Sequence, residues 1–222
     1  MVISRSINPE NIVEGYDEYI ASISYGKDSL AMLDVIWLCG YPLTKIITVD
    51  VMATPEMSAN FEEVEEFKKK ADKIIFERYG IQVEHLKSNV SYEEEFYRKR
   101  GNGKRTKPEN VGKIYGFPMT MGAWCNRSLK MQAINKYKKP NQFWYVGYAL
   151  DEKKEERQEK IRNCKDLRLY PLVRENDRTD VSGTVQGNRF VKSYIYNFSK
   201  GWLLVLSQSV FGSIKVIEKK TS

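Results

Sequence analysis

The sequence predicts an α/β fold with a doubly wound, mostly parallel sheet and helices on both of its faces. Two observations lead to it. Residues 19–24 form a short β-prone run that stops before a Gly, and residues 29–38 then carry apolar side chains at helical spacing. The same order recurs in a strand-like run at 45–49 and a helical pattern over 56–79. Because alternating strands and helices are joined by right-handed crossovers, their strands pair in parallel.

Later segments extend this pattern. Gly80 ends the second helix, and residues 81–86 follow as a third strand. We expect a helix over 124–137 and a strand over 143–146, and residues 167–173 are a candidate for one more strand. The chain thus divides into one domain over residues 1–173 and an irregular tail over 174–222, which is either divergent or frameshifted.

Composition excludes several classes of protein. The chain has 222 residues, 41% of them hydrophobic, which is enough for one core. It lacks a run of about 18 apolar residues, and charges are scattered through its first twenty residues. We therefore expect a cytoplasmic protein with no signal peptide and no membrane partner. The three cysteines show no CxxC spacing, so neither a disulfide framework nor a self-sufficient zinc site is predicted.

The net charge of +7 indicates an anionic partner or simply a soluble surface. Much of this charge lies in residues 97–113, which also contain Gly and Pro and almost no apolar residues. The basic side chains are Arg98, Lys99, Arg100, Lys104, Arg105, Lys107 and Lys113. The pattern predicts a basic, mobile loop, which either clamps a phosphate-rich or nucleic-acid substrate or is an ordinary solvated loop.

The loop between the first strand and the first helix is the candidate site. It consists of Ser24, Tyr25, Gly26, Lys27, Asp28 and Ser29. In a parallel sheet, ligands bind beyond the carboxyl ends of the strands, where the next helix presents free N–H groups. Gly26 lets the backbone approach a phosphate, Lys27 adds a charge, and the two serines add hydroxyl donors. The loop is therefore either a phosphate site or a plain surface turn.

The spacing of this loop differs from a Walker A loop and from a GxGxxG fingerprint. It resembles the SGGKDS-type PP-loop that ATP pyrophosphatases share with PAPS reductases, although Tyr25 stands where many members have a second Gly. This resemblance covers residues 15–173. It implies an adenine nucleotide alpha-hydrolase-like fold, with ATP or PAPS as the bound nucleotide.

The resemblance also implies roles for residues outside the loop. Asp50 ends the second strand, where members often hold an acidic residue near the nucleotide, and Gly147 opens the adenine or ribose pocket. Cys125 and Lys130 lie in a segment where a Cys and a Lys, one helical turn apart, face the site. The only histidine, His85, is expected to be a strand residue.

A further set of implied residues is polar. Asp151 and Glu152 follow the strand that ends at Gly147, and they either hold Mg²⁺ or begin a helix with acidic residues. Four basic side chains suit the electrostatic stabilisation on which nucleotidyl chemistry depends, namely Lys27, Arg127, Lys130 and Arg157.

Three functions remain open at this point. One is PAPS reductase-like sulfur chemistry, for which Cys125 would substitute for the C-terminal Glu-Cys-Gly-Leu-His-type motif that this sequence lacks. Another is ATP pyrophosphatase-type adenylation in nucleic-acid sulfur modification. The third is a non-catalytic protein that binds a nucleotide or nucleic acid.

The tail generates a prediction about the gene. If residues 200–207 are encoded AAA GGT TGG TTG TTG GTG TTG TCC, reading one base later gives Lys-Val-Gly-Cys-Trp-Cys-Cys-Pro. That resembles the cysteine cluster of phage-type family members, and the same frame gives further cysteines over residues 180–188. We predict a frameshift near Arg174, which would remove an iron–sulfur or zinc site pairing Cys125 with downstream cysteines. The nucleotide sequence tests this, and a next frame without the cluster would leave a divergent but genuine extension.

Overall fold

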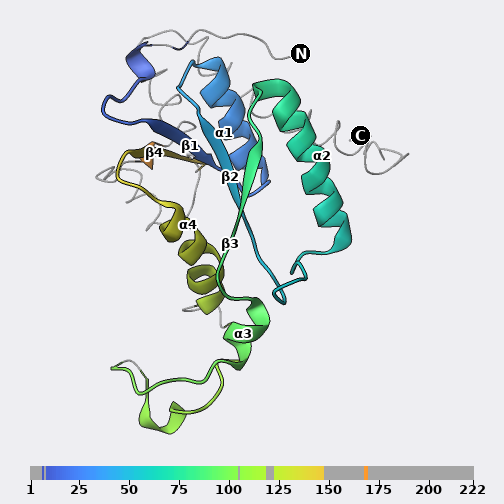
Figure 1. Cartoon of the computed structure of the whole chain (residues 1–222), viewed down its shortest axis with the longest axis vertical. Helices are drawn as coiled ribbons and strands as arrows, with labels where there is room; N and C mark the ends of the chain where they lie inside the picture. Colours follow the sequence, from blue (N-terminus) through green and yellow to red (C-terminus); the bar gives the residue numbers. More distant parts are fainter. Residues whose placement is uncertain (1–6, 8, 105, 119–122, 148–167, 170–222) are drawn as a thin grey trace, which may run out of the picture.

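The computed structural model describes residues 7, 9–104, 106–118, 123–147 and 168–169. It contains one sheet whose five strands are all parallel, in the order β3-β2-β1-β4-β5 (Figure 1). The strands are β1 (Glu18–Ser22), β2 (Lys45–Asp50), β3 (Val83–Lys87), β4 (Gln142–Val146) and the two-residue β5 (Arg168–Leu169). The predicted α/β class with a parallel sheet is confirmed.

One face of the sheet packs against α1 (Lys27–Leu38) and α2 (Glu62–Tyr79). The register places Ala21 beside Ile46 and Tyr145, and all three side chains are fully buried on this face. Apolar residues of both helices complete the core cluster, and they include Leu33, Ile36, Ala71 and Ile75. The main core therefore lies between the sheet and these two helices.

The opposite face holds a smaller core. Ile20, Ile47 and Trp144 are buried there, and Ile134 and Tyr137 of α4 (Gln132–Tyr137) pack against them. The Tyr137 hydroxyl donates to a carboxylate oxygen of Glu84 at 2.6 Å. Burial of the ring and this bond raise the pKa of Tyr137 to about 12. Helices thus lie on both faces, as the sequence predicts.

Two helix boundaries differ from those expected. The second helix begins at Glu62 rather than at residue 56, because residues 52–58 form a turn closed by an antiparallel bridge between Met52 and Ser58. The helix expected over 124–137 changes type along its length, since a π-helix, η3 (Asn126–Met131), precedes α4. Its wider turn is seen where the Gln132 N–H donates to the carbonyl of Arg127, five residues back.

The helix α3 (Tyr92–Tyr97) was not expected. Its signal is a capping box, in which the Ser91 hydroxyl accepts from the Glu94 N–H at 3.3 Å and the Glu94 carboxylate accepts from the Ser91 N–H at 2.6 Å. Two short 3₁₀ turns, η1 (Pro9–Asn11) and η2 (Pro108–Asn110), complete the elements.

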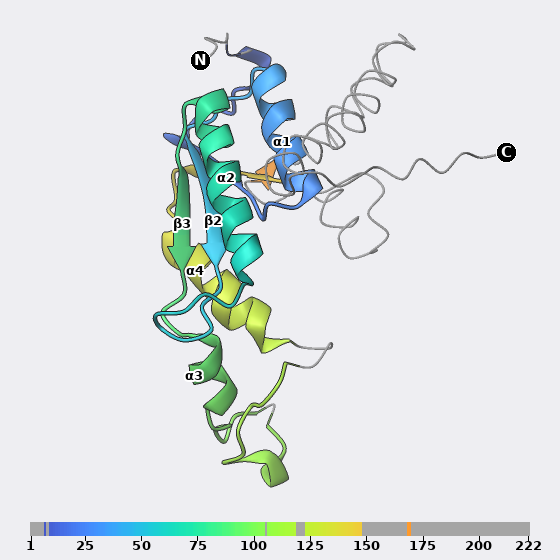
Figure 2. The same cartoon turned by 90° about the vertical axis from the view of Figure 1, so that its right-hand side faces the viewer.

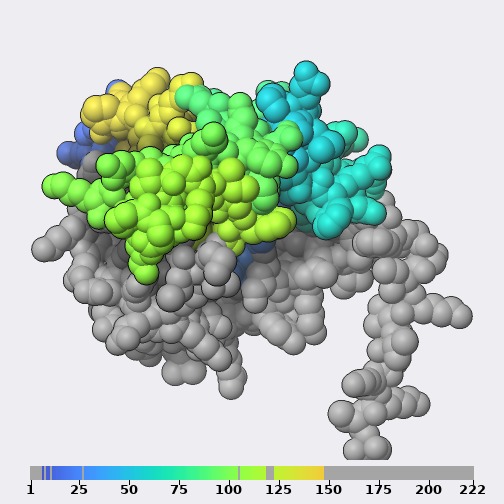
Figure 3. Space-filling view, turned by 90° about the horizontal axis from the view of Figure 1, so that it is seen from below, coloured from blue at the N-terminus to red at the C-terminus, as the bar shows by residue number. Residues whose placement is uncertain are grey.

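The strands end on the side of the molecule where α3 lies, as the arrowheads of β2 and β3 show in Figure 2. Seen from that side, α3 and the segment after it make up much of the described surface (Figure 3). The predicted tail over 174–222 lies outside the described residues. None of the helices in the described ranges is long and apolar enough to span a membrane.

One carboxylate holds the amino ends of the three central strands. Glu18 begins β1, and one of its oxygens accepts from the Lys45 ammonium at the start of β2. The other accepts from the side-chain amide of Gln142, the first residue of β4, at 2.7 Å. The bond from Lys45, followed by that from Gln142, lowers the pKa of Glu18 below 4.5.

This arrangement predicts a pH-dependent contribution to stability. Because the pKa of Glu18 is lowered in the folded chain, its contribution is present above pH 4.5 and is lost as the pH falls below that value. Glu18→Gln should therefore lower the free energy of unfolding by about 1 kcal/mol at pH 7 and by less at acid pH. Urea denaturation at several pH values measures this. Glu66→Gln, at an exposed position of α2, is the control, and an equal effect of both variants contradicts the assignment.

Candidate functional site

The loop that connects β1 to α1 is closed on itself by Ser29. The hydroxyl of Ser29 accepts from the Ser24 N–H at 3.2 Å and donates to the Gly26 carbonyl at 2.8 Å. Gly26 is the N-cap of α1, and its carbonyl also accepts the first helical bond, from the Leu30 N–H at 3.1 Å. Ser29 is buried, so these bonds are shielded from water. The loop is preformed at the carboxyl edge of the sheet.

Tyr25 has a left-handed backbone, with φ of 58°. It is the single non-glycine residue with positive φ among the described ranges, and such a conformation costs of order 1–3 kcal/mol. Glycine is the residue that usually occupies such a position. The backbone adopts the glycine-like conformation although a bulky side chain is present.

Contacts of the Tyr25 side chain offset this strain. Its hydroxyl donates to Asp72 at 2.5 Å, and its ring meets the ring of Phe67 edge-on with centroids 6.5 Å apart. Burial of the ring and the bond to Asp72 raise the pKa of Tyr25 well above its usual range. The phenol therefore stays protonated and remains a donor.

The Tyr25 hydroxyl belongs to a set of polar side chains that we call the Tyr25 network, composed of Tyr25, Asp50, Lys68, Asp72 and His85. Asp50 accepts from the Lys68 ammonium at 2.7 Å, and its other oxygen lies 2.9 Å from Nδ1 of His85. Nε2 of His85 lies 3.1 Å from Asp72 and 3.4 Å from the Tyr25 hydroxyl. Each ring nitrogen of His85 thus lies within hydrogen-bond distance of a carboxylate oxygen.

Helix α2 supplies two of the five members of this network, because its inner face is polar in its first half and apolar in its second. Glu65, Lys68, Asp72, Ile75 and Tyr79 are spaced three and four residues apart, so they share one face. The helix runs against the strands, and its first half therefore lies at the carboxyl edge (Figure 1). The polar members face the site, whereas the apolar ones enter the core.

Glu65 shows how this polar half is held. Burial disfavours its charged form, but hydrogen bonds from Asn60, Ser58 and Lys68 outweigh burial and lower the pKa of Glu65. The bonds from Ser58 and Asn60 are 2.8 and 2.7 Å long. Glu65 thereby links the turn that precedes α2 to the ammonium group of the buried Lys68.

Gly147 directly follows β4 and lies against the first turn of α1. A Cβ atom at this position would lie 3.0 Å from Cα of Ser29 and 3.1 Å from the carbonyl oxygen of Asp28. Those are backbone atoms, which cannot rotate away, so the approach requires glycine. The contact occurs between β1 and β4, where the strand order reverses, which is the usual place for a ligand in an open α/β sheet.

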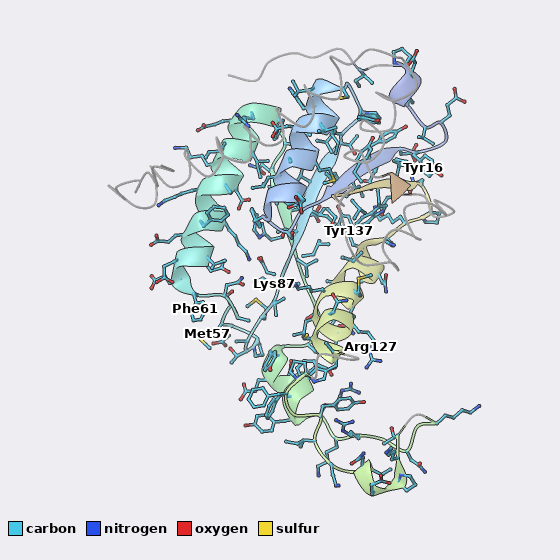
Figure 4. The ribbon with its side chains drawn as sticks, turned by 180° about the vertical axis from the view of Figure 1, so that it is seen from behind. Tyr16, Met57, Phe61, Lys87, Arg127 and Tyr137 are labelled. Atoms are coloured by element: carbon cyan, nitrogen blue, oxygen red, sulfur yellow. The ribbon has the colours of Figure 1, made fainter. Side chains whose placement is uncertain are left out.

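Three of the predicted site residues belong to η3 and its N-cap. Arg127 and Lys130 are exposed on η3, and Cys125, its N-cap, is partly buried. Figure 4 shows Arg127 at the end of η3 nearest α3. No hydrogen bond or ion pair joins these three side chains to Ser24–Ser29 in the part of the chain that the structure describes. Their part in the site therefore stays a prediction.

Other predicted residues are placed only in part. Asp50 lies at the end of β2, as expected, with both carboxylate oxygens engaged by Lys68 and His85. Asp151, Glu152 and Arg157 lie outside the described residues. Within the described ranges, no group of three or more His, Cys, Asp and Glu side chains is arranged to hold a metal ion.

Sequence reasoning missed Lys68 and Asp72. The sequence contained a signal for them, because these two polar residues lie on the same face of α2 as the buried Ile75 and Tyr79. His85 is a strand residue, as expected, yet it also reaches the Tyr25 hydroxyl, which its position in β3 did not reveal.

The chain was compared with models of protein families, with curated proteins and with solved structures, and no match was found in any of the three.

The Tyr25 network predicts how loss of the Tyr25 hydroxyl group changes the stability of the fold. Tyr25→Phe keeps the ring but loses the bond to Asp72, so the free energy of unfolding should fall by about 1–2 kcal/mol. Tyr16→Phe is the matched control, because the Tyr16 ring packs on Phe143 and its hydroxyl bonds to none of the described residues. It should change stability by less than about 0.5 kcal/mol. Urea denaturation measures both, and equal changes would show that the network does not support the loop.

Proposed function

We propose that this chain is an enzyme that binds an adenine nucleotide at Ser24–Ser29 and resembles PAPS reductases in its chemistry. One observation carries the proposal: a preformed loop, with a left-handed residue at its second position, touches the end of β4 at the reversal of the strand order. The order β3-β2-β1-β4-β5 is also compatible with the adenine nucleotide alpha-hydrolase-like fold that the resemblance implies. We include that fold in the proposal.

The loop would bind phosphate mainly through its backbone. The first N–H groups of a helix have no acceptor within the helix, and the helix dipole adds partial positive charge at the same end. In α1 these groups begin at Lys27, directly after the Gly26 N-cap. Because Ser29 already fixes the loop, little reorganisation accompanies binding. Lys27 would add the charge that neutralises a second phosphate oxygen.

The Tyr25 network would hold the loop in place without touching the nucleotide. Asp50 and Asp72 each have partners on both carboxylate oxygens, in Lys68, His85 and Tyr25. A carboxylate whose charge is already paired with the Lys68 ammonium repels an incoming phosphate less than a free carboxylate does. We assign these residues to positioning rather than to catalysis.

A second candidate is ATP pyrophosphatase-type adenylation, which needs the phosphate loop after β1 but no reactive thiol. Attack at the α-phosphate needs bound phosphates and nearby positive charge. Asp151 and Glu152, which either hold Mg²⁺ or begin a helix, lie outside the described ranges.

Titration calorimetry with ATP and with PAPS, with and without Mg²⁺, tests the proposal. We expect binding that Lys27→Ala abolishes and that Gly147→Ala weakens by about 10- to 100-fold, since its methyl group displaces the first turn of α1. Gly101→Ala is the control, because a Cβ atom there meets nothing within 4 Å. Thiol-dependent sulfite release from PAPS would identify the reductase, and pyrophosphate release from ATP the adenylating enzyme. No binding of either nucleotide contradicts both.

A further inference from the structure

The segment that follows α3 forms a paired structure, which we call the basic hairpin (residues 98–116). An antiparallel bridge joins Lys99 to Ile114. On either side of it, the Arg100 N–H donates to the Lys113 carbonyl at 2.8 Å and the Tyr115 N–H donates to the Arg98 carbonyl at 2.9 Å. The hairpin projects beyond α3, away from the sheet (Figures 1 and 2).

Nearly all of the net charge of the protein is concentrated here. Residues 97–118 contain seven Lys and Arg but one acidic residue, Glu109, so they carry six of the seven net positive charges. The described lysines of the hairpin are all exposed, namely Lys99, Lys104, Lys107 and Lys113. Among the described basic side chains of the hairpin, only Arg98 pairs with a carboxylate, that of Glu95. Such a local field attracts a polyanion.

Exposed aromatic rings lie at the base of the hairpin. Tyr97 is 61% exposed and Phe117 is 75% exposed, and both rings meet Phe96 edge-on at centroid distances of 4.9 and 5.0 Å. Trp124 supports the end of the hairpin, because its indole N–H donates to the Gly116 carbonyl at 3.1 Å. Two exposed rings on a fixed support are suited to stack on unpaired bases.

Two arginines of the hairpin are held on the ring of Tyr115. The guanidinium carbons of Arg98 and Arg100 lie 4.1 and 4.8 Å from the centre of the Tyr115 ring. Arg98 also donates to Glu95 at 2.9 Å, and Arg100 donates to the Tyr115 carbonyl at 3.2 Å. The cations are therefore positioned before any ligand arrives, which lowers the entropy cost of binding.

We propose that the basic hairpin, with Tyr97 and Phe117, is a binding surface for single-stranded nucleic acid. Its lysines contact phosphates and its two exposed rings stack on bases. A base-paired helix hides the faces of its bases from such rings, so an unpaired strand binds better. Anionic lipid headgroups would be attracted by the same lysines, so lipid vesicles form the competing arm of the test. The surface does not depend on nucleotide binding at Ser24–Ser29.

Fluorescence anisotropy with labelled oligo(dT) and oligo(U) of about 20 nucleotides, at several salt concentrations, tests the lysines. Lys104→Ala with Lys107→Ala should weaken binding and reduce the slope of log K against log salt by about 1.4, or about 0.7 for each phosphate that is no longer neutralised. Lys69→Ala with Lys73→Ala removes the same charge from exposed positions of α2 and should leave the slope unchanged. Equal losses of affinity in the two double variants overturn the proposal.

The same assay tests the aromatic rings. Phe117→Ala should weaken binding by about 5- to 100-fold with little change in the salt slope. Phe61→Ala is the control, since that ring is 81% exposed at the N-cap of α2. Because both rings are exposed, neither variant endangers the core. Unchanged binding by Phe117→Ala, tighter binding of a duplex, or binding of phosphatidylserine vesicles without binding of either oligonucleotide overturns the assignment.

Discussion

The close approach of Gly147 to the first turn of α1 is the constraint on which the candidate site depends. A Cβ atom at Gly147 would lie within 3.0 Å of the Ser29 backbone, so the end of β4 and the start of α1 lie too close for any side chain between them. The loop after β1 is therefore held by two sets of contacts. Gly147 at the end of β4 lies against it, and the Ser29 hydroxyl bonds to Ser24 and Gly26 within it. A site built in this way is ready before its ligand arrives, and this property favours electrostatic binding of phosphate over induced fit.

The second support of the loop comes from the helix that also forms the core. α2 contributes Lys68 and Asp72 to the Tyr25 network and, further along the same face, Ile75 to the buried cluster. The strained backbone at Tyr25 is tolerated because its side chain is anchored on this helix. Loop conformation and packing of the core are consequently coupled through a single rigid element.

The sequence predicted the parts of the structure that depend on local pattern. The first strand, loop and helix, the parallel sheet, and the positions of Asp50 and Gly147 at strand ends follow from spacing and turn residues. The parts that it did not predict depend on contacts between distant residues. Tyr25 meets Asp72 and His85, which are 47 and 60 positions away, and no local pattern reveals such pairs. The late start of α2 has a local cause instead, because a bridge between Met52 and Ser58 competes with the helical pattern.

The π-helix before α4 has a consequence for the orientation of the hairpin. An α-helix advances about 100° for each residue, so one residue more or less in this stretch rotates the preceding segment by that angle relative to α4. η3 accommodates additional residues in its wider turn, and it lies between Trp124, which supports the hairpin, and α4, which packs on the sheet. A change in its length would therefore turn Trp124, and the contact that Trp124 makes with Gly116, relative to the sheet. Deletion or insertion of a single residue in η3 is a route by which homologous chains could redirect that surface without altering either the sheet or the hairpin.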